Sequence, residues 1–312
     1  MRARLLVVGI SLLILAVSMA FPTVLNLVFD GIDLALGWAG SLTVVLLVSA
    51  LTGVLFILAF PHVSAQGWIV SVKDRIKYNL LAIRIFQDNL KSVLSSTAGT
   101  LGWNFAYLGL NILPMVILAG PFMAVWFQLN AHYAFEPLQV GEERLVSVEL
   151  RGPEEGEAVD PARVEVLPAT GEGLVENWRV AGPIVRLDTS DPDGRPRLLI
   201  PIEATAPGSG ALLLRYQGEE VLKGLEVETR PQRLAQVRTA EPWDEFLATR
   251  DPLVWFGEPI LPADSFVRTV FVDYDAAPLG PFGGGEITIM VLFVIVSLAV
   301  GFGLKGRFGV EI

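Results

Sequence analysis

The sequence predicts an α+β membrane protein with four transmembrane helices, a cytosolic amphipathic helical arm and an extracytoplasmic all-β, immunoglobulin-like sandwich domain. Three observations lead to this prediction. Of the 312 residues, 52% are hydrophobic and only 18% are charged, as is typical of multi-span membrane proteins. Four long apolar segments occur along the chain. Short alternating or β-branched segments, separated by turn residues, fill residues 136–276.

The first apolar segment, residues 5–29, follows the basic start formed by Arg2 and Arg4. A basic start before an apolar run also fits a signal peptide with a cleavage site near Ala20. We favour a retained helix because the apolar run continues past that point. The second segment, residues 41–60, has the ~20 residues needed to cross a bilayer, and we expect Pro61 to end it.

Residues 66–98 are predicted to form the helical arm. Apolar side chains recur there every three or four positions, opposite the charged ones. Because no proline or glycine interrupts residues 68–98, the sequence predicts one continuous helix of ~45 Å. Five cations of the arm are expected to contact a client chain, a ribosome or anionic lipid, or only to anchor the arm on lipid headgroups. They are Lys73, Arg75, Lys77, Arg84 and Lys91. They form too small a patch for direct nucleic-acid recognition.

The third span, residues 103–127, lies in a stretch without Asp, Glu, Lys or Arg that runs from residue 92 to residue 135. Five polar residues recur at spacings of three and four, which places them on one helix face. They are Thr97, Thr100, Asn104, Tyr107 and Asn111. We interpret this stripe as a polar groove open to the cytosol. The alternative is that these groups hydrogen-bond neighbouring helices and hold them together.

The β domain, residues 136–276, is followed by a proline- and glycine-rich linker and a fourth span, residues 287–304, within the last part of the chain, 277–312. The membrane domain before it is residues 1–135. Expected strands are 144–150, 163–167, 178–187, 197–203, 211–216, 221–228 and 266–274, and 242–251 is an expected helix. In the fourth span, the small-residue pairs Ser297/Gly301 and Ala299/Gly303 indicate close helix packing.

Charge predicts the orientation. Residues 136–286 hold 14 Lys+Arg and 28 Asp+Glu, whereas the rest of the chain holds 9 and 5. The positive-inside rule places the basic flanks, and therefore both termini, in the cytosol. The acidic β domain then lies outside the cytoplasmic (inner) membrane of a prokaryote.

Catalytic and metal chemistry find little support in the sequence. Cysteine is absent and the only histidines are His62 and His132, so we expect no metal, no cofactor and no enzymatic activity. Acidic pairs such as Glu154/Glu155 and Asp191/Asp193 are typical of solvated turns. Gln128, Asn130 and His132 are interpreted as a linker at the outer membrane surface.

Residues 113–118 (LPMVIL) and 129–138 (LNAHYAFEPL) resemble the YidC/Oxa-type insertase superfamily, in particular its minimal three-span branch of archaeal YidC-like proteins and an ER membrane complex subunit. The resemblance covers about 40–138 and 287–312. It implies a groove lined by Asn104, Tyr107 and Asn111 and an arm that receives the client or ribosome. The family's arm is usually a two-helix coiled coil, and its bacterial members carry a positive groove residue that has no counterpart here.

The expected function is therefore a membrane insertase or chaperone that helps client segments, such as nascent membrane proteins, enter the bilayer. The alternative is a membrane-anchored scaffold or binding protein whose exported β-sandwich recognises an envelope protein.

Overall fold

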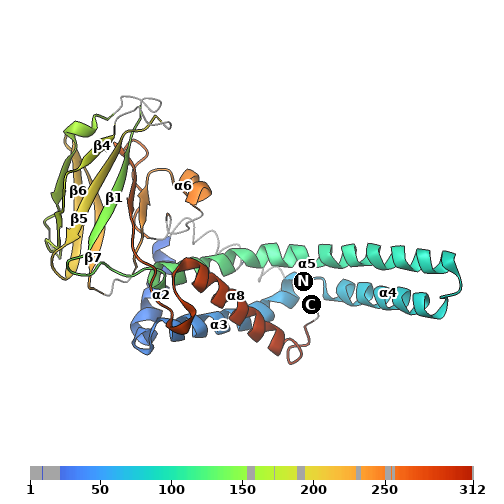
Figure 1. Ribbon diagram of the computed structural model, residues 1–312. Helices are drawn as coiled ribbons and strands as arrows, with labels where there is room; N and C mark the ends of the chain where they lie inside the picture. Colours follow the sequence, from blue (N-terminus) through green and yellow to red (C-terminus); the bar gives the residue numbers. More distant parts are fainter. Residues whose placement is uncertain are drawn as a thin grey trace. The chain divides into compact units, whose positions relative to one another are not determined.

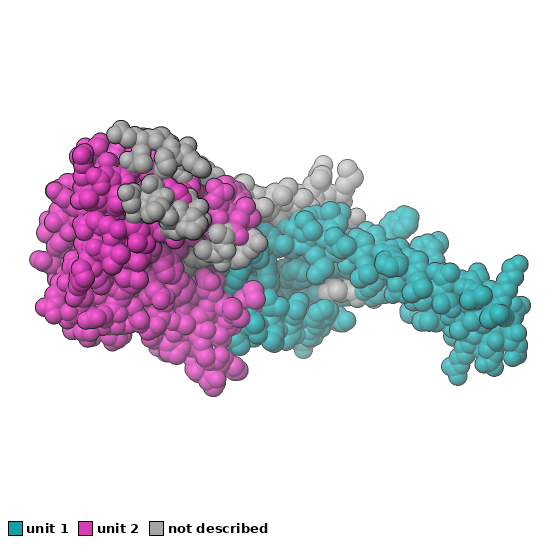
Figure 2. Space-filling model, turned by 45° about the horizontal axis from the view of Figure 1, so that its top comes forward, with its two compact units in different colours: residues 1–21, 43–126, 291–312 teal, residues 22–42, 127–290 magenta. Residues whose placement is uncertain are grey.

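The computed structural model describes residues 9, 22–152, 159–171, 173–187, 194–229, 233–249, 254 and 257–310. Within these ranges the fold is α+β, with α-helices and two antiparallel sheets (Figure 1). The chain divides into two compact units, coloured separately in Figure 2. Unit 1 comprises 1–21, 43–126 and 291–312, and unit 2 comprises 22–42 and 127–290. Each is described by itself.

Three helices of the described residues are long and apolar enough to cross a membrane. They are α3 (Ser41–Val63), α5 (Leu90–Tyr133) and α8 (Gly285–Leu304). The prediction that Pro61 ends the second span is wrong, because α3 continues through Pro61 to Val63. A proline in the last turn removes only one hydrogen bond, and the Ser64 amide still donates to the Phe60 carbonyl at 2.9 Å.

The predicted span 5–29 lies mostly outside the described residues. Its last part belongs to α2 (Pro22–Leu36), which runs on through Asp30 and Asp33. These carboxylates are tolerated in the helix because they have partners. Asp33 accepts a hydrogen bond from the Tyr133 hydroxyl at 2.6 Å, and Asp30 pairs with Arg233.

The arm is a two-helix hairpin, so the prediction of one continuous helix is wrong. Helix α4 (Gln66–Ile85) ends in a turn, and α5 begins at Leu90 and runs back beside it (Figure 1). The Phe86 amide donates to the Ala82 carbonyl, and the Asn89 amide donates to the Phe86 carbonyl, both at 2.9 Å. The Asn89 side chain then accepts from the Ser92 amide at 3.2 Å, which caps α5 without any glycine or proline.

Two antiparallel sheets make up most of unit 2. The first has the order β3-β5-β1-β9-β8, with β4 also paired to β5, and the second has the order β2-β6-β7. Their bounds are β1 Glu143–Leu150, β2 Glu165–Pro168, β3 Trp178–Val180, β4 Val185–Leu187, β5 Arg197–Ala204, β6 Gly208–Tyr216, β7 Glu219–Val227, β8 Val237–Thr239 and β9 Val267–Val272. Both sheets contribute to one hydrophobic core, for example through Val146 and Val148 of β1 and Leu212 and Leu214 of β6.

Most strands lie near their predicted positions, with three differences. The expected strand 178–187 splits into β3 and β4, because Pro183 between them has no amide to donate. Strand β6 starts at Gly208, three residues before the expected strand 211–216, and a Cβ at Gly210 would lie 2.0 Å from the Asn177 Oδ1 atom. Strand β8 was not predicted. The expected helix is α6, Pro242–Thr249. Glu154/Glu155 and Asp191/Asp193 lie outside the described residues.

Candidate functional site

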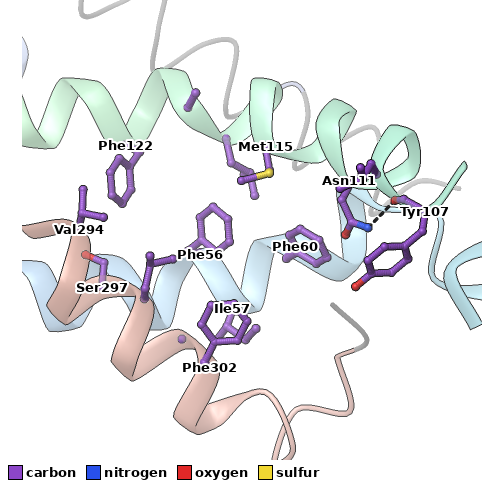
Figure 3. A pocket seen from close by; sticks show the side chains of 15 residues that line it. Phe56, Ile57, Phe60, Tyr107, Asn111, Met115, Phe122, Val294, Ser297 and Phe302 are labelled. Atoms are coloured by element: carbon purple, nitrogen blue, oxygen red, sulfur yellow. Dashed lines mark hydrogen bonds between the residues drawn. The ribbon is translucent and has the colours of Figure 1, made fainter. Parts of the chain in front are cut away.

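A cavity of about 530 Å³ lies in unit 1 between α3, α5 and α8 (Figure 3). Its lining is almost entirely apolar, and none of the lining residues carries a charge. The lining residues are Phe56, Ile57, Phe60, Tyr107, Leu108, Asn111, Met115, Leu118, Ala119, Phe122, Val294, Ser297, Leu298, Gly301 and Phe302. The side chains of Asn111 and Tyr107 lie at one end, and those of Phe122 and Val294 at the other (Figure 3).

One wall of the cavity is a tight seam between α3 and α8. The Ser297 hydroxyl donates to the Ser49 carbonyl at 2.9 Å. A Cβ at Gly301 would lie 3.5 Å from the Gly53 carbonyl oxygen, so the predicted packing role of the Ser297/Gly301 pair is confirmed. The second pair has no such role in the described residues, because a Cβ at Gly303 would have no neighbour within 4 Å.

Asn111 supplies a polar group inside this apolar lining. Its Nδ2 atom donates to the Tyr107 carbonyl of its own helix at 2.8 Å (Figure 3). Its Oδ1 atom is buried and accepts no hydrogen bond from the described residues. A buried carbonyl oxygen without a donor costs about 1–3 kcal/mol. The lining therefore contains an acceptor without a donor, and because Oδ1 is buried the amide has to turn before an occupant of the cavity can donate to it.

The structure brings only Tyr107 and Asn111 of the predicted stripe into the cavity lining. The other three side chains bond to carbonyls of their own helix four residues earlier. Thr97 donates to Val93 at 2.8 Å, Thr100 to Ser96 at 2.9 Å, and Asn104 to Thr100 at 2.8 Å. Asn104 and Asn111 thus have the same local hydrogen bond but different surroundings.

The arm cations fall into two groups. Arg75 lies over the Trp103 ring, with Cζ 4.3 Å from the ring centroid, and Lys73 Nζ lies 5.9 Å from the Tyr107 centroid. Lys77 pairs with Asp74 at 3.3 Å. The remaining two, Arg84 and Lys91, are exposed near the turn of the hairpin. Exposed Ile85, Phe86, Leu90 and Leu94 accompany them.

A polar cluster in unit 2 joins α2 to the last turns of α5. Gln128 Nε2 donates to Asn26 Oδ1 at 2.5 Å. His132 Nε2 lies 3.5 Å from Asp30 Oδ1, and Arg233 Nη1 lies 3.2 Å from both oxygens of the same carboxylate.

The interpretation of Gln128, Asn130 and His132 as a linker is wrong. They belong to α5, and Gln128 and Asn130 are fully buried. Asn26, Asp30 and Asp33 are four and then three residues apart, which places their polar side chains on one face of α2. This spacing was the sequence signal for a polar helix face that packs against Gln128 and His132.

A second cavity, of about 340 Å³, adjoins this cluster in unit 2. Its lining residues are Asp33, Gly37, Gly40, Ser41, His132, Tyr133, Phe135, Pro137, Thr229 and Ala277. Among the described residues, no group of three or more His, Asp or Glu side chains could hold a metal ion. The cluster and its cavity join α2, α5 and the segment that begins at Arg233 within one unit.

A buried ion pair lies inside the β domain. Lys223, 1% exposed, contacts the Glu258 carboxylate and donates to the Ala235 carbonyl at 2.7 Å. Nearby, burial raises the pKa of the Tyr274 phenol, and the negative charge of Glu258 adds to the rise. The Tyr274 hydroxyl lies 3.4 Å from the Gly224 carbonyl. These groups hold β7 to its neighbours.

No protein-family model, curated protein or solved structure matches this chain. The features from which a function can be inferred are therefore the apolar cavity with its amide, the arm hairpin and the exposed surface of the β domain.

Proposed function

We propose that this protein is a membrane insertase or membrane-protein chaperone of the YidC/Oxa type, acting without a cofactor. The observation that carries the proposal is the uncharged cavity between three candidate spans, with Asn111 at the end nearest the arm. The order of elements supports it: a span (α3), a two-helix arm, a span (α5), an outer domain and a last span (α8). The hairpin agrees with the two-helix arm that the family resemblance implies.

The mechanism is physical rather than covalent. A polar group of a client that enters hydrocarbon without a partner costs several kcal/mol. An amide and a phenol at the arm end of the cavity give such a group temporary partners, which divides one high barrier into two lower ones. Pro114 and Pro121 lie inside α5, and each leaves the carbonyl four residues earlier without its helical donor.

In this proposal the arm and both termini lie in the cytosol, residues 5–29 form a fourth span, and residues 136–276 form an immunoglobulin-like sandwich outside the inner membrane. Arg84 and Lys91, with the exposed apolar side chains around them, are the part of the arm that meets the nascent client or the ribosome. Thr97, Thr100 and Asn104 form the path from the arm to the cavity.

The test is insertion of a short-tailed membrane protein into vesicles that contain the purified protein. Asn111→Leu removes the cavity amide, and Asn104→Leu is the matched control, since both amides donate to a carbonyl four residues earlier at 2.8 Å. We expect a severalfold loss of insertion for Asn111→Leu and a smaller loss for Asn104→Leu. If neither substitution changes insertion, the cavity is not the insertion path.

One observation favours the second candidate, a membrane-anchored scaffold. On α6, Trp243 and Leu247 are four residues apart and are 57% and 58% exposed, which forms an apolar ridge on the β domain. A scaffold that recognises an envelope protein through this ridge would lose its partner in a Trp243→Ser/Leu247→Ser variant. It would keep that partner in Asn111→Leu, so cross-linking in intact cells separates the two candidates.

A further inference from the structure

Two lysines lie over aromatic rings that line the 530 Å³ cavity of unit 1. Lys73 Nζ lies 5.9 Å from the centroid of the Tyr107 ring, and Lys305 Nζ lies 5.5 Å from the centroid of the Phe302 ring. Both rings line the cavity, whose lining residues themselves carry no charge. The two lysines come from different elements, α4 and the residue that follows α8. An apolar space whose lining rings carry cations beside them suits an occupant with an apolar body and an anionic head.

The size of the cavity decides between a peptide helix and a hydrocarbon chain. A helix about 10–12 Å wide that crosses a ~30 Å hydrocarbon core displaces on the order of 2,400–3,400 Å³. The cavity holds about 530 Å³, which lies within the ~300–1,000 Å³ typical of small-molecule sites. It is therefore too small to enclose a client helix and large enough for one lipid chain.

The rim of the cavity points to entry from lipid. Leu108, Met115, Leu298 and Phe302 line the cavity and are also exposed. Exposed apolar side chains at a rim are stable next to hydrocarbon and unfavourable next to water. An acyl chain can therefore enter sideways between the helices.

The amide of Asn111 adds one requirement for the occupant. Its Oδ1 atom is a buried acceptor and accepts no hydrogen bond from the described residues. Asn111 lies at the same end of the cavity as Tyr107 (Figure 3). Lys73 lies over the ring of Tyr107. A lipid headgroup that carries hydroxyl donors as well as a phosphate matches both the acceptor and the cations.

We propose that this cavity is a binding site for one anionic phospholipid. One acyl chain fills the space between α3, α5 and α8. The phosphate lies beside Lys73 and Lys305, and a headgroup hydroxyl donates to Asn111 Oδ1 after the amide turns into the cavity. This site goes beyond the proposed insertase function and does not depend on it. In an insertase, this lipid is the resting occupant that a client displaces.

Native mass spectrometry of the full chain in a neutral detergent tests the proposal. The probes are phosphatidylglycerol, phosphatidylcholine with the same acyl chains, and inorganic phosphate. We expect one phosphatidylglycerol per chain, bound about tenfold more tightly than phosphatidylcholine. Excess inorganic phosphate should not displace it, because the acyl chain supplies much of the binding.

Variants then locate the site. Lys73→Gln/Lys305→Gln should weaken phosphatidylglycerol binding about 25-fold, since each cation near a lipid headgroup is worth about fivefold. Asn111→Leu should weaken it about fivefold, the effect of one hydrogen bond. Ala119→Trp should block the cavity and abolish binding. The matched control Arg84→Gln/Lys91→Gln removes the same charge from the other end of the arm and should leave the affinity unchanged.

Three results would overturn the proposal: equal affinity for the two lipids, displacement by inorganic phosphate, or an equal loss in the lysine variant and its control. Failure of the insertase function leaves these measurements unaffected, because they involve no client. Conversely, a chain that inserts clients but retains no anionic lipid contradicts only the lipid site.

Discussion

The backbones of Gly53 in α3 and Ser297 in α8 are in direct contact. A Cβ atom on Gly53 would lie 2.4 Å from the Ser297 carbonyl oxygen, closer than such atoms can approach. The seam between the two helices, which forms one wall of the apolar cavity, therefore requires glycine at position 53.

Gly53→Ala should destabilise the helix bundle by about 1–3 kcal/mol, the usual cost of overpacking a tight interior. Gly109→Ala is the control, because a Cβ at Gly109 meets nothing within 4 Å. That substitution should be neutral or slightly stabilising. Thermal unfolding of both variants in detergent is the measurement, and equal melting temperatures would show that the seam is not close-packed.

A disulfide can test the arm hairpin in this cysteine-free chain. A Cβ on Gly99 would lie 3.2 Å from Cγ of Asn79, so Asn79→Cys/Gly99→Cys should cross-link on mild oxidation. In one continuous helix these positions would be ~30 Å apart, at ~1.5 Å per residue. Gel mobility before and after reduction reports the outcome.

The control for the cross-link is Tyr78→Cys/Gly99→Cys. Tyr78 is 69% exposed and lies ~100° around α4 from Asn79, so this pair should stay reduced under the same conditions. Equal cross-linking of the two pairs would mean that the arm lacks the packing described here.

The β domain should lose stability in alkali through Tyr274. Because burial raises the pKa of this phenol in the folded state, the neutral form is favoured by folding. The contribution of Tyr274 to the free energy of unfolding is complete below the ordinary tyrosine pKa of ~10. It falls as the pH rises above that value, since only the unfolded chain then releases the proton. Urea unfolding between neutral and alkaline pH measures the effect.

In that experiment Tyr274→Phe is the reference, because it keeps the ring and removes the titrating group. The difference in unfolding free energy between the two proteins should be constant up to about pH 10. Above that pH the parent protein should lose stability relative to Tyr274→Phe. A constant difference through the alkaline range would place Tyr274 in contact with water.

The sequence pattern alone predicted the elements that consist of a long apolar run or of clearly alternating residues. The helices α3 and α8 are uninterrupted apolar runs, and β1, β5 and β7 alternate clearly, so their positions were predicted to within a few residues. The α+β class follows from the same runs. Pro61 misled the prediction of the end of α3 because a proline in a last turn removes little.

The remaining features depend on contacts between distant segments. The arm turn at Phe86–Asn89 holds no glycine or proline, and only the capping residue Asn89 marks it. The polar stripe follows from spacing alone, but spacing cannot show that Asn111 lines the cavity while Asn104 does not. Burial of Gln128 depends on Asn26, 102 residues away in the sequence.

The most direct test of the insertase proposal is site-specific photo-cross-linking from the cavity to a stalled client segment. A photoreactive residue at Met115 lies in the cavity lining, and one at Met123 lies on the same helix outside it. The proposal predicts a client adduct from position 115 and little or none from position 123. Equal adducts from both positions, or none from position 115 while insertion proceeds, would contradict it.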